Sequence, residues 1–284
     1  MKQVTAIITT HNRKELLERA IKSVLAQTYS NMELIVVDDA SDDGTDELCR
    51  FYELTYIYIP KNEKKGTNYA RNLGIKTAKG DYIAFLDDDD YWLPEKIEKQ
   101  VNLIESKDCE LVYCGMRHEI ISNNDISYRD IFPSPNNQGD MHKRILWTIP
   151  TTTSNILVKK DALYAIGLFD EKLNYWQETE LNIRLAQRKP FYFVNEILCV
   201  YRVNINDPNR MTNKYHGWIK SVKYIHKKHK KLYKSLSFKE KYQVHMLITQ
   251  DRCRRTKNAG MKFKNLFYRG YLRLVRVFYV HVLK

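Results

Sequence analysis

The sequence predicts an α/β fold, in which a mostly parallel sheet is flanked by helices and followed by a basic helical extension. The first observation behind this prediction is that short apolar runs alternate with segments of helical periodicity along the first part of the chain. Such alternation favours parallel strands joined by right-handed helical crossovers. The second is charge: residues 211–284 hold 20 Lys and Arg against two acidic residues, a net +18, whereas residues 1–210 carry −5.

Each element expected in the first part has its own signal in the sequence. β-branched or apolar runs predict strands at residues 4–10 (VTAIITT), 33–37 (ELIVV), 54–59 and 81–86 (DYIAFL). Apolar residues at helical spacing predict helices at 13–27, 45–52 and 67–78. Asn12 and Glu15 have the spacing of a capping box at the start of the first helix, and Gly80 closes the third.

The second part is less regular. Strands are expected at 110–115, at 155–159 and within 191–202, a helix at 177–188, and a polar loop at 122–140. From residue 212 the pattern is helical, with breaks near Ser235–Ser237 and Gly260. The turn Asp207-Pro208-Asn209, where the charge changes sign, predicts a boundary at 205–212.

Composition excludes several classes of protein. With 43% hydrophobic residues in 284, the chain can bury a sizeable core. It contains no run of about 18 apolar residues and no recognisable signal peptide. Five cysteines without CxxC spacing make a zinc site or disulfide framework unexpected and fit reduced thiols in a cytosol. The first strand–helix turn has no Gly and no P-loop occurs, so dinucleotide-binding and P-loop enzymes lose their main support.

Three polar clusters follow predicted strands: Thr9–Asn12, Asp38-Asp39 and Asp87–Asp90. Ligands of open α/β sheets bind at the carboxyl ends of strands. Four consecutive carboxylates repel one another, and a divalent cation would relieve that repulsion. Mn²⁺ and Mg²⁺ both accept oxygen ligands. The alternative for Asp87–Asp90 is a solvated acidic turn that caps a following helix with Pro94 in its first turn.

Three segments, AIITTHNR (6–13), ELIVVDDASDDGT (33–45) and GTNYARNLGIKTAKGDYIAFLDDDDYW (66–92), occur in one order at suitable spacing. Together they resemble the family 2 glycosyltransferases, whose fold is the Rossmann-like GT-A fold. The resemblance covers residues 4–115 densely and 150–202 more loosely.

The resemblance implies a nucleotide site at the three clusters. Thr9 and His11, which replace the family's usual Pro and Tyr, would lie against the base, with Asn12 beside them. Asp39 would accept from the uracil N–H, and Arg71 would approach the base or the diphosphate. For Asp39 the alternative is a turn or cap aspartate, and for Arg71 a surface arginine.

The acidic loop resembles the family's DxD motif in either of two registrations, Asp87-x-Asp89 or Asp88-Asp89. Asp89 is common to both and is implied as the metal ligand, while Asp87 or Asp88 would contact the ribose. The metal would be Mn²⁺ or Mg²⁺.

The segment FDEKLNYWQETELNIRLAQ (169–187) resembles the family's acidic pair at a helix start. Glu178 falls at the position of the catalytic base, where the family usually has Asp, and Glu180 is the second candidate. The alternative is that both only stabilise a helix N-terminus. The polar segment Thr151–Asn155 precedes a strand where the family often has sugar-contacting residues, and an ordinary polar loop is an equal alternative.

The resemblance implies an inverting, metal-dependent transferase that moves one hexosyl or N-acetylhexosaminyl group from a UDP-sugar. The processive Gln-x-x-Arg-Trp motif and membrane spans are absent from the sequence, which favours single addition. A saccharide or lipid-linked oligosaccharide acceptor, as in capsule or cell-surface polysaccharide synthesis, is expected. The alternatives are a nucleotidyltransferase acting on a sugar phosphate and a non-catalytic protein that binds membrane surfaces.

We therefore expect a GT-A catalytic domain at 1–210, with a nucleotide-binding half at 1–115 and an acceptor and catalytic-base half at 116–210. Residues 211–284 form the basic extension. Its predicted helices at 214–234 and 261–284 are basic and rich in aromatic residues, which suits an anionic membrane surface. The protein would then be cytoplasmic and peripheral on the inner face of the membrane. Packing of these helices on the catalytic domain is the alternative, and nucleic-acid binding is not expected because no binding motif accompanies the charge.

Overall fold

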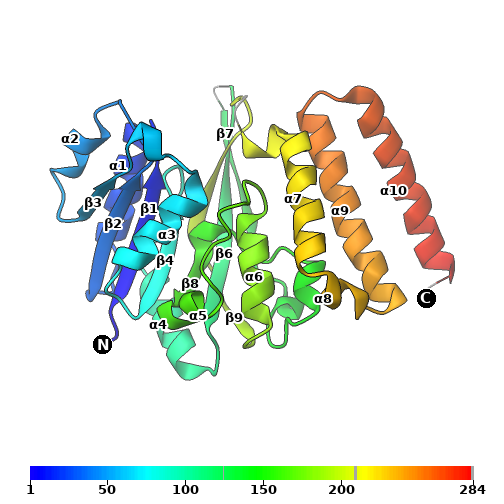
Figure 1. Cartoon of the computed structure of the whole chain (residues 1–284), viewed down its shortest axis with the longest axis horizontal. Coiled ribbons are helices and arrows are strands. Elements are labelled where there is room, and N and C mark those ends of the chain that lie inside the picture. Colours follow the sequence, from blue (N-terminus) through cyan, green and yellow to red (C-terminus); the bar gives the residue numbers. More distant parts are fainter. Residues whose placement is uncertain (124, 208–209, 283–284) are drawn as a thin grey trace. The chain divides into compact units, whose positions relative to one another are not determined.

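The structure, a computed structural model, describes residues 1–123, 125–207 and 210–282 (Figure 1). The chain divides into two compact units. The first unit comprises Met1–His142, Pro150–Leu173 and Gln177–Asn206, and the second comprises Lys143–Ile149, Asn174–Trp176 and Asp207–Lys284. Two short segments from the middle of the chain thus belong to the second unit. Pro208 and Asn209 of the predicted boundary turn lie outside the described residues.

The first unit is built on one mixed sheet with the strand order β3-β2-β1-β4-β8-β6-β9-β5, and β7 pairs with β6. The neighbours β3, β2, β1 and β4 are parallel, as are β6 and β9, whereas β8, β5 and β7 run antiparallel to their partners. The strands are β1 Val4–Thr10, β2 Met32–Asp38, β3 Thr55–Tyr58, β4 Tyr82–Asp87, β5 Tyr91–Trp92, β6 Leu111–Ser122, β7 Asp125–Ile131, β8 Ile156–Lys159 and β9 Phe191–Asn204. The predicted α/β class with a mostly parallel sheet is confirmed.

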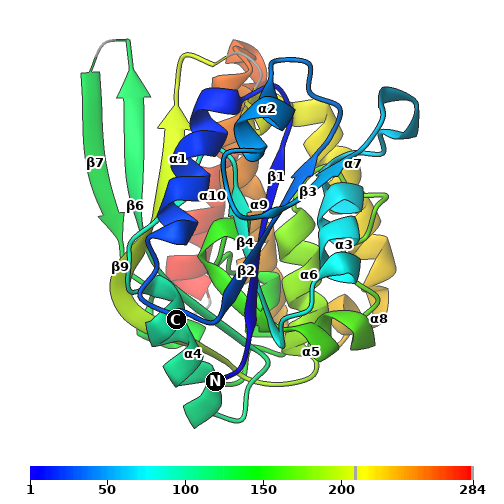
Figure 2. The ribbon, with the colours of Figure 1, turned by 90° about the vertical axis from the view of Figure 1, so that its left-hand side faces the viewer.

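Helices cover both faces of the parallel strands. Successive side chains of a strand point to opposite faces, and the apolar residues of these strands therefore need covering on both. Ile8 and Val36 join the apolar cluster that includes Leu17 of α1. Ile7, on the other face, lies under α3, and Figure 2 shows α1 and α3 on opposite sides of these strands. The helices of this unit are α1 Lys14–Leu25, α2 Thr45–Cys49, α3 Thr67–Thr77, α4 Lys96–Ser106, α5 Lys160–Ala165 and α6 Gln177–Ala186.

Gly74 sets the close approach of α3 to the sheet. A Cβ at this position would lie 2.6 Å from Ile7 Cγ2 and 3.3 Å from Val37 Cγ2, so a larger residue would push α3 away from β1 and β2. Arg71 lies one turn earlier on the same helix. The glycine therefore helps to hold Arg71 close to the carboxyl edge of the sheet.

Two details of the sequence analysis are wrong. Asn12 does not cap α1: it has a left-handed backbone (φ 51°), and the N-cap is Arg13, which makes no side-chain cap hydrogen bond. The expected loop at 122–140 contains the strand β7, paired along its length with an extended β6. Most β7 side chains are exposed, so the strand is held by backbone pairing to β6 and by the ion pair between Arg117 and Asp130 rather than by a buried apolar face.

The second unit is helical, with α7 Tyr215–Lys228, α8 Lys230–Lys234, α9 Phe238–Asn258 and α10 Lys262–Val282. Its core includes Trp218, which is fully buried, packs edge-to-face on Trp176 and has the Arg255 guanidinium 5.0 Å from its ring. Both predicted helix breaks are confirmed: Ser237 forms a capping box with Glu240, and Gly260 (φ 67°) follows the end of α9. Over the described residues, no helix is long and apolar enough to cross a membrane.

Candidate active site

Three strand ends of the first unit bring the predicted clusters together. Thr9 of β1 is in register with Asp87 of β4, and Thr10 of β1 is in register with Asp38 of β2. The polar residues that follow β1, β2 and β4 are therefore neighbours at one edge of the sheet, as parallel strands require. Arg71 and Gln177 approach this edge from α3 and α6.

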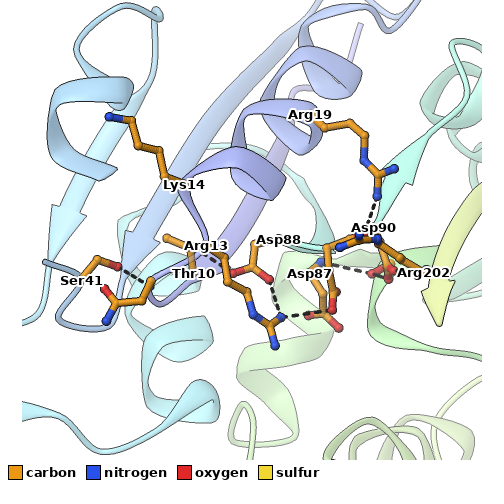
Figure 3. A network of polar contacts seen from close by, with 12 residues as sticks. Thr10, Arg13, Lys14, Arg19, Ser41, Asp87, Asp88, Asp90 and Arg202 are labelled. Carbon is orange, nitrogen blue, oxygen red and sulfur yellow. Dashed lines mark hydrogen bonds and ion pairs between the residues drawn. The ribbon is translucent and has the colours of Figure 1, made fainter. Parts of the chain in front are cut away.

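The acidic loop has two buried and two partly exposed carboxylates. Asp88 accepts from Thr10 Oγ1 at 2.9 Å and Arg13 Nη1 at 3.0 Å, and Asp90 accepts from Ser154 Oγ at 2.6 Å and the Arg202 N–H at 2.9 Å (Figure 3). The side chains of Asp87 and Asp89 are 32% and 34% exposed. Asp88 and Asp90 thus anchor the loop, and Asp87 and Asp89 alternate with them toward solvent.

The acidic loop does not cap a helix, so that alternative is wrong. The loop leads into the two-residue strand β5, which pairs with β9. The next helix, α4, begins at Lys96 after an N-cap at Glu95 that makes no side-chain cap hydrogen bond.

Negative charge in the loop is only partly compensated. Burial raises the pKa of Asp88 to about 7, although Arg13 opposes the shift, and burial followed by the charge of Asp87 raises the pKa of Asp89. The pKa of Asp90 is raised well above its usual value by burial and by the charges of Asp89 and Asp87. A cation at this edge would favour the ionised carboxylates.

The loop fits a divalent metal that shares its ligands with a phosphate group. Mg²⁺ is typically bound through one or two carboxylates plus substrate phosphates, and Asp89 offers a partly exposed carboxylate for such a site. Within the described part of the chain, no group of three or more His, Cys, Asp or Glu side chains could hold a metal by itself. The residues therefore suit a metal held jointly with a ligand rather than a closed protein cage.

Arg13 was not among the predicted site residues. Its Nη1 lies 3.0 Å from Asp88 Oδ1 and 3.1 Å from Asp89 Oδ2, so one guanidinium group bridges a buried and a partly exposed carboxylate. Arg19 supports the same loop by donating from Nη2 to the Asp89 carbonyl at 2.8 Å. The position of Arg13 directly after the His11-Asn12 pair was the sequence signal that could have identified it.

The two aspartates after β2 differ in their hydrogen bonds. Asp38 is buried and accepts from the Ser41 N–H at 2.8 Å and Tyr56 OH at 2.7 Å. Asp39 is 8% exposed, and its buried Oδ1 has no hydrogen-bond partner among the described residues. Lys64 Nζ lies 3.5 Å from Asp39 Oδ2. Asp39 therefore keeps a buried acceptor available for a donor such as the N–H of a nucleotide base.

The predicted nucleotide-binding residues at the end of β1 and directly after it differ in exposure and in their contacts. Thr9 is buried and His11 is exposed. Asn12 holds the loop after β2, because its Oδ1 accepts from the Asp42 N–H at 2.8 Å and its N–H donates to Ser41 Oγ at 2.9 Å.

Arg71 is not a surface arginine. It is 4% exposed, and its Nη2 lies 2.6 Å from Asp87 Oδ1 while Nη1 donates to Gln177 Oε1 at 2.9 Å. The guanidinium group also lies 5.4 Å from the centre of the Phe169 ring. Arg71 thus joins the acidic loop to the first residue of α6.

The two candidate bases on α6 have different environments. Glu180 is fully buried and paired with Arg184, whose Nη2 lies 2.7 Å from Glu180 Oε2. Glu178 is partly exposed. Burial raises the pKa of Tyr201, and the charges of the acidic loop and of Glu178 raise it further. Glu178 and the acidic loop therefore act electrostatically on the same Tyr201 ring.

Ser154, in the polar segment 151–155, supports the acidic loop. Its Oγ donates to Asp90 Oδ2 and accepts from the Asp87 N–H at 3.1 Å, and its carbonyl accepts from Trp92 Nε1 at 2.7 Å. This segment is therefore more than an ordinary polar loop, because it fixes the conformation of the candidate site.

Comparison with known proteins agrees with this geometry. The family model described as "Glycosyl transferase family 2" matches residues 5–167. An uncharacterised glycosyltransferase of Rickettsia typhi is 35% identical over 208 residues, which cover 71% of this chain and 64% of that protein. The Escherichia coli protein WfaP, named UDP-Glc:alpha-D-GlcNAc-diphosphoundecaprenol beta-1,3-glucosyltransferase, is 39% identical over 136 residues, 48% of this chain and 53% of WfaP. The chain thus spans less than two thirds of the length of these relatives.

A solved structure also matches. The chain resembles residues 1–349 of S. aureus TarS, solved in complex with UDP, with a TM-score of 0.57 at 16% identity, covering 98% of this chain and 91% of that one. The likeness at this identity is one of fold, and it confirms the expected GT-A fold.

Proposed function

The chain belongs to glycosyl transferase family 2, and on that premise we propose that it transfers a single sugar from a UDP-sugar donor to a saccharide acceptor with inversion. The observation that carries the proposal is the unpartnered, buried Oδ1 of Asp39 directly after β2, on the same sheet edge as the acidic loop that follows β4. A uracil N–H would satisfy that acceptor. S. aureus TarS, which shares the fold, has been solved with UDP and with UDP-GlcNAc.

In the proposed reaction Glu178 takes the proton of the acceptor hydroxyl as its oxygen bonds to the anomeric carbon. The bond from that carbon to the diphosphate breaks, and the nucleoside diphosphate leaves with the bonding electrons. Asp89 would hold a Mn²⁺ or Mg²⁺ ion that supplies positive charge for the departing diphosphate, and Asp87 or Asp88 would contact the ribose. Arg71 positions Asp87 through their ion pair.

We further propose that the acceptor is lipid-linked and that the reaction belongs to capsule or cell-surface polysaccharide assembly. The name of WfaP, which includes a diphosphoundecaprenol acceptor, supports this proposal. The protein would then work on the inner face of the membrane, as a peripheral protein attached through its basic extension.

A donor screen tests the proposed activity. We expect Mn²⁺- or Mg²⁺-dependent release of nucleoside diphosphate from one UDP-sugar, lost with EDTA and in Asp89→Ala but kept in Asp125→Ala, which removes an exposed aspartate on β7. Release of pyrophosphate from a nucleoside triphosphate and a sugar phosphate would instead identify a nucleotidyltransferase. If no nucleotide or nucleotide sugar bound, a non-catalytic role would be favoured.

A further inference from the structure

The two basic helices of the second unit differ in what they expose. In α7 the apolar residues Trp218, Val222 and Ile225 are buried, at 0%, 6% and 1% exposure. The lysines of the same helix lie at the surface. Helix α7 therefore offers positive charge to its surroundings, and none of its described large apolar side chains is fully exposed.

Helix α10 exposes large apolar side chains. Phe263, Leu266, Phe267 and Leu274 are 92%, 70%, 67% and 72% exposed. At 3.6 residues per turn these positions share one side of the helix. The opposite side faces the rest of the unit, where Asn265 Nδ2 donates to the Cys253 carbonyl of α9. The packing of α10 within its unit thus leaves this apolar face uncovered.

The apolar face of α10 extends onto α9. A groove of about 590 Å³ lies between residues of the two helices, and its lining includes Phe238 and Tyr242 of α9 and Tyr271 and Leu274 of α10. Phe238 is itself 65% exposed. The exposed apolar area is therefore wider than a single helical stripe.

Basic residues border this face. Lys262, Arg269 and Arg273 are exposed and fall along one edge of it, and Lys264 falls along the other. Residues 262–282 contain no Asp or Glu. An apolar face with cationic edges and no acidic residue complements the surface of an anionic bilayer, where acyl chains lie below negatively charged headgroups.

We propose that α10 is the element that enters an anionic membrane, with Phe263, Phe267 and Leu274 among the acyl chains and Arg269 and Arg273 at the headgroups. Helix α7, although rich in lysine, contributes only long-range attraction. The inference rests on the membrane attachment proposed above and assigns it to one helix face.

Flotation of the full chain with phosphatidylcholine vesicles, with and without phosphatidylglycerol, tests the assignment. We expect binding to anionic vesicles to fall at least tenfold in Phe263→Ser/Phe267→Ser/Leu274→Ser. Arg269→Gln/Arg273→Gln should also bind more weakly and with less dependence on salt. The matched control Lys220→Gln/Lys223→Gln removes the same charge from α7 and should bind within about twofold of the wild type.

Several outcomes would overturn the inference. One is equal loss of binding in the α7 and α10 charge variants, and another is unchanged flotation of the triple apolar variant. A dimer in gel filtration that the triple variant converts to a monomer would show that a second copy covers the face instead. Circular dichroism confirms that each variant is folded.

Donor hydrolysis separates this inference from the proposed activity. The triple variant should keep wild-type release of nucleoside diphosphate in the absence of membranes, because the substituted residues lie outside the candidate site. Vesicle binding without any donor turnover would reject the transferase proposal and leave the α10 assignment standing. Donor turnover without any binding of the wild type to vesicles would reject the α10 assignment and leave the transferase proposal standing.

Discussion

The Arg71 guanidinium lies 2.6 Å from the Asp87 carboxylate, so a buried arginine of α3 holds one of the two partly exposed carboxylates of the acidic loop. Arg71→Ala should cost about 2 kcal/mol of unfolding free energy, because a charged hydrogen-bond donor is removed from both Asp87 and Gln177. It should also weaken donor binding. Urea unfolding and UDP titration measure the two effects, and Lys76→Ala, on the exposed side of the same helix, should change neither.

The two glutamates of α6 should separate catalysis from stability. Glu178→Gln should lower turnover by about 10²- to 10⁴-fold, as expected for loss of a general base, with little change in donor affinity. Glu180→Gln should lower the free energy of unfolding by about 3 kcal/mol, because it leaves Arg184 without its buried carboxylate. Steady-state kinetics and denaturation of both variants check this prediction. Loss of turnover in Glu180→Gln, with normal turnover in Glu178→Gln, would make Glu180 the base.

The aspartates after β2 provide a second matched pair. Asp39→Ala should weaken UDP binding by about tenfold to a hundredfold with little loss of stability, because its Oδ1 has no partner to lose and its Oδ2 has only the long, partly exposed ion pair with Lys64. Asp38→Ala should mainly destabilise the fold, since it removes the acceptor of Ser41 and Tyr56. Calorimetric titration with UDP, alongside thermal unfolding, distinguishes them. Equal UDP affinity in wild type and Asp39→Ala would contradict the assigned base contact.

Lys96 should give the stability of the fold a dependence on alkaline pH. It is fully buried beside the Trp92 ring, Gln100 and the thiols of Cys114 and Cys199, and burial lowers its pKa from 10.5 to about 8. Between these two pH values the unfolded chain binds more protons than the folded one, so stability contributed by this group rises with pH, by up to about 3 kcal/mol.

Lys96→Met should remove that rise. Urea unfolding at about pH 8 and about pH 10 measures the slope. The exposed Lys61→Met is the matched control and should retain the wild-type slope. An unchanged slope in Lys96→Met would assign the alkaline dependence to other groups.

Local sequence patterns were sufficient to predict the parallel strands and the position of the acidic loop. The runs at 4–10 and 81–86 are apolar on both faces, as buried parallel strands require, and β1 and β4 follow them closely. The strand β7 could not be predicted in the same way. Its residues are exposed, so it lacks the buried apolar run that marks β1 and β4, and its signal was only the short alternation of Ile126 and Tyr128 with polar residues.

The roles of individual carboxylates depended on distant contacts. The sequence alone is compatible with both Asp87-x-Asp89 and Asp88-Asp89 as the motif. Burial of Asp88 and Asp90 depends on partners such as Ser154, 64 residues away from Asp90. The Glu180–Arg184 ion pair is easier to predict from the sequence, because residues four apart on a helix are neighbours. Only Glu180 has a basic residue four positions later, since Glu178 is followed at that spacing by Asn182.

The hydrogen bonds from Ser154 and Arg202 to Asp90 have a consequence for protein synthesis. Ser154 and Arg202 are synthesised, and leave the ribosome, well after the acidic loop at residues 87–90. A nascent chain of about 115 residues would carry Asp39, Arg71 and Asp89 but would lack the groups that hold the loop in place. We therefore expect nucleotide binding to begin only after β9 has emerged, so the donor cannot assist the folding of the first strands during translation.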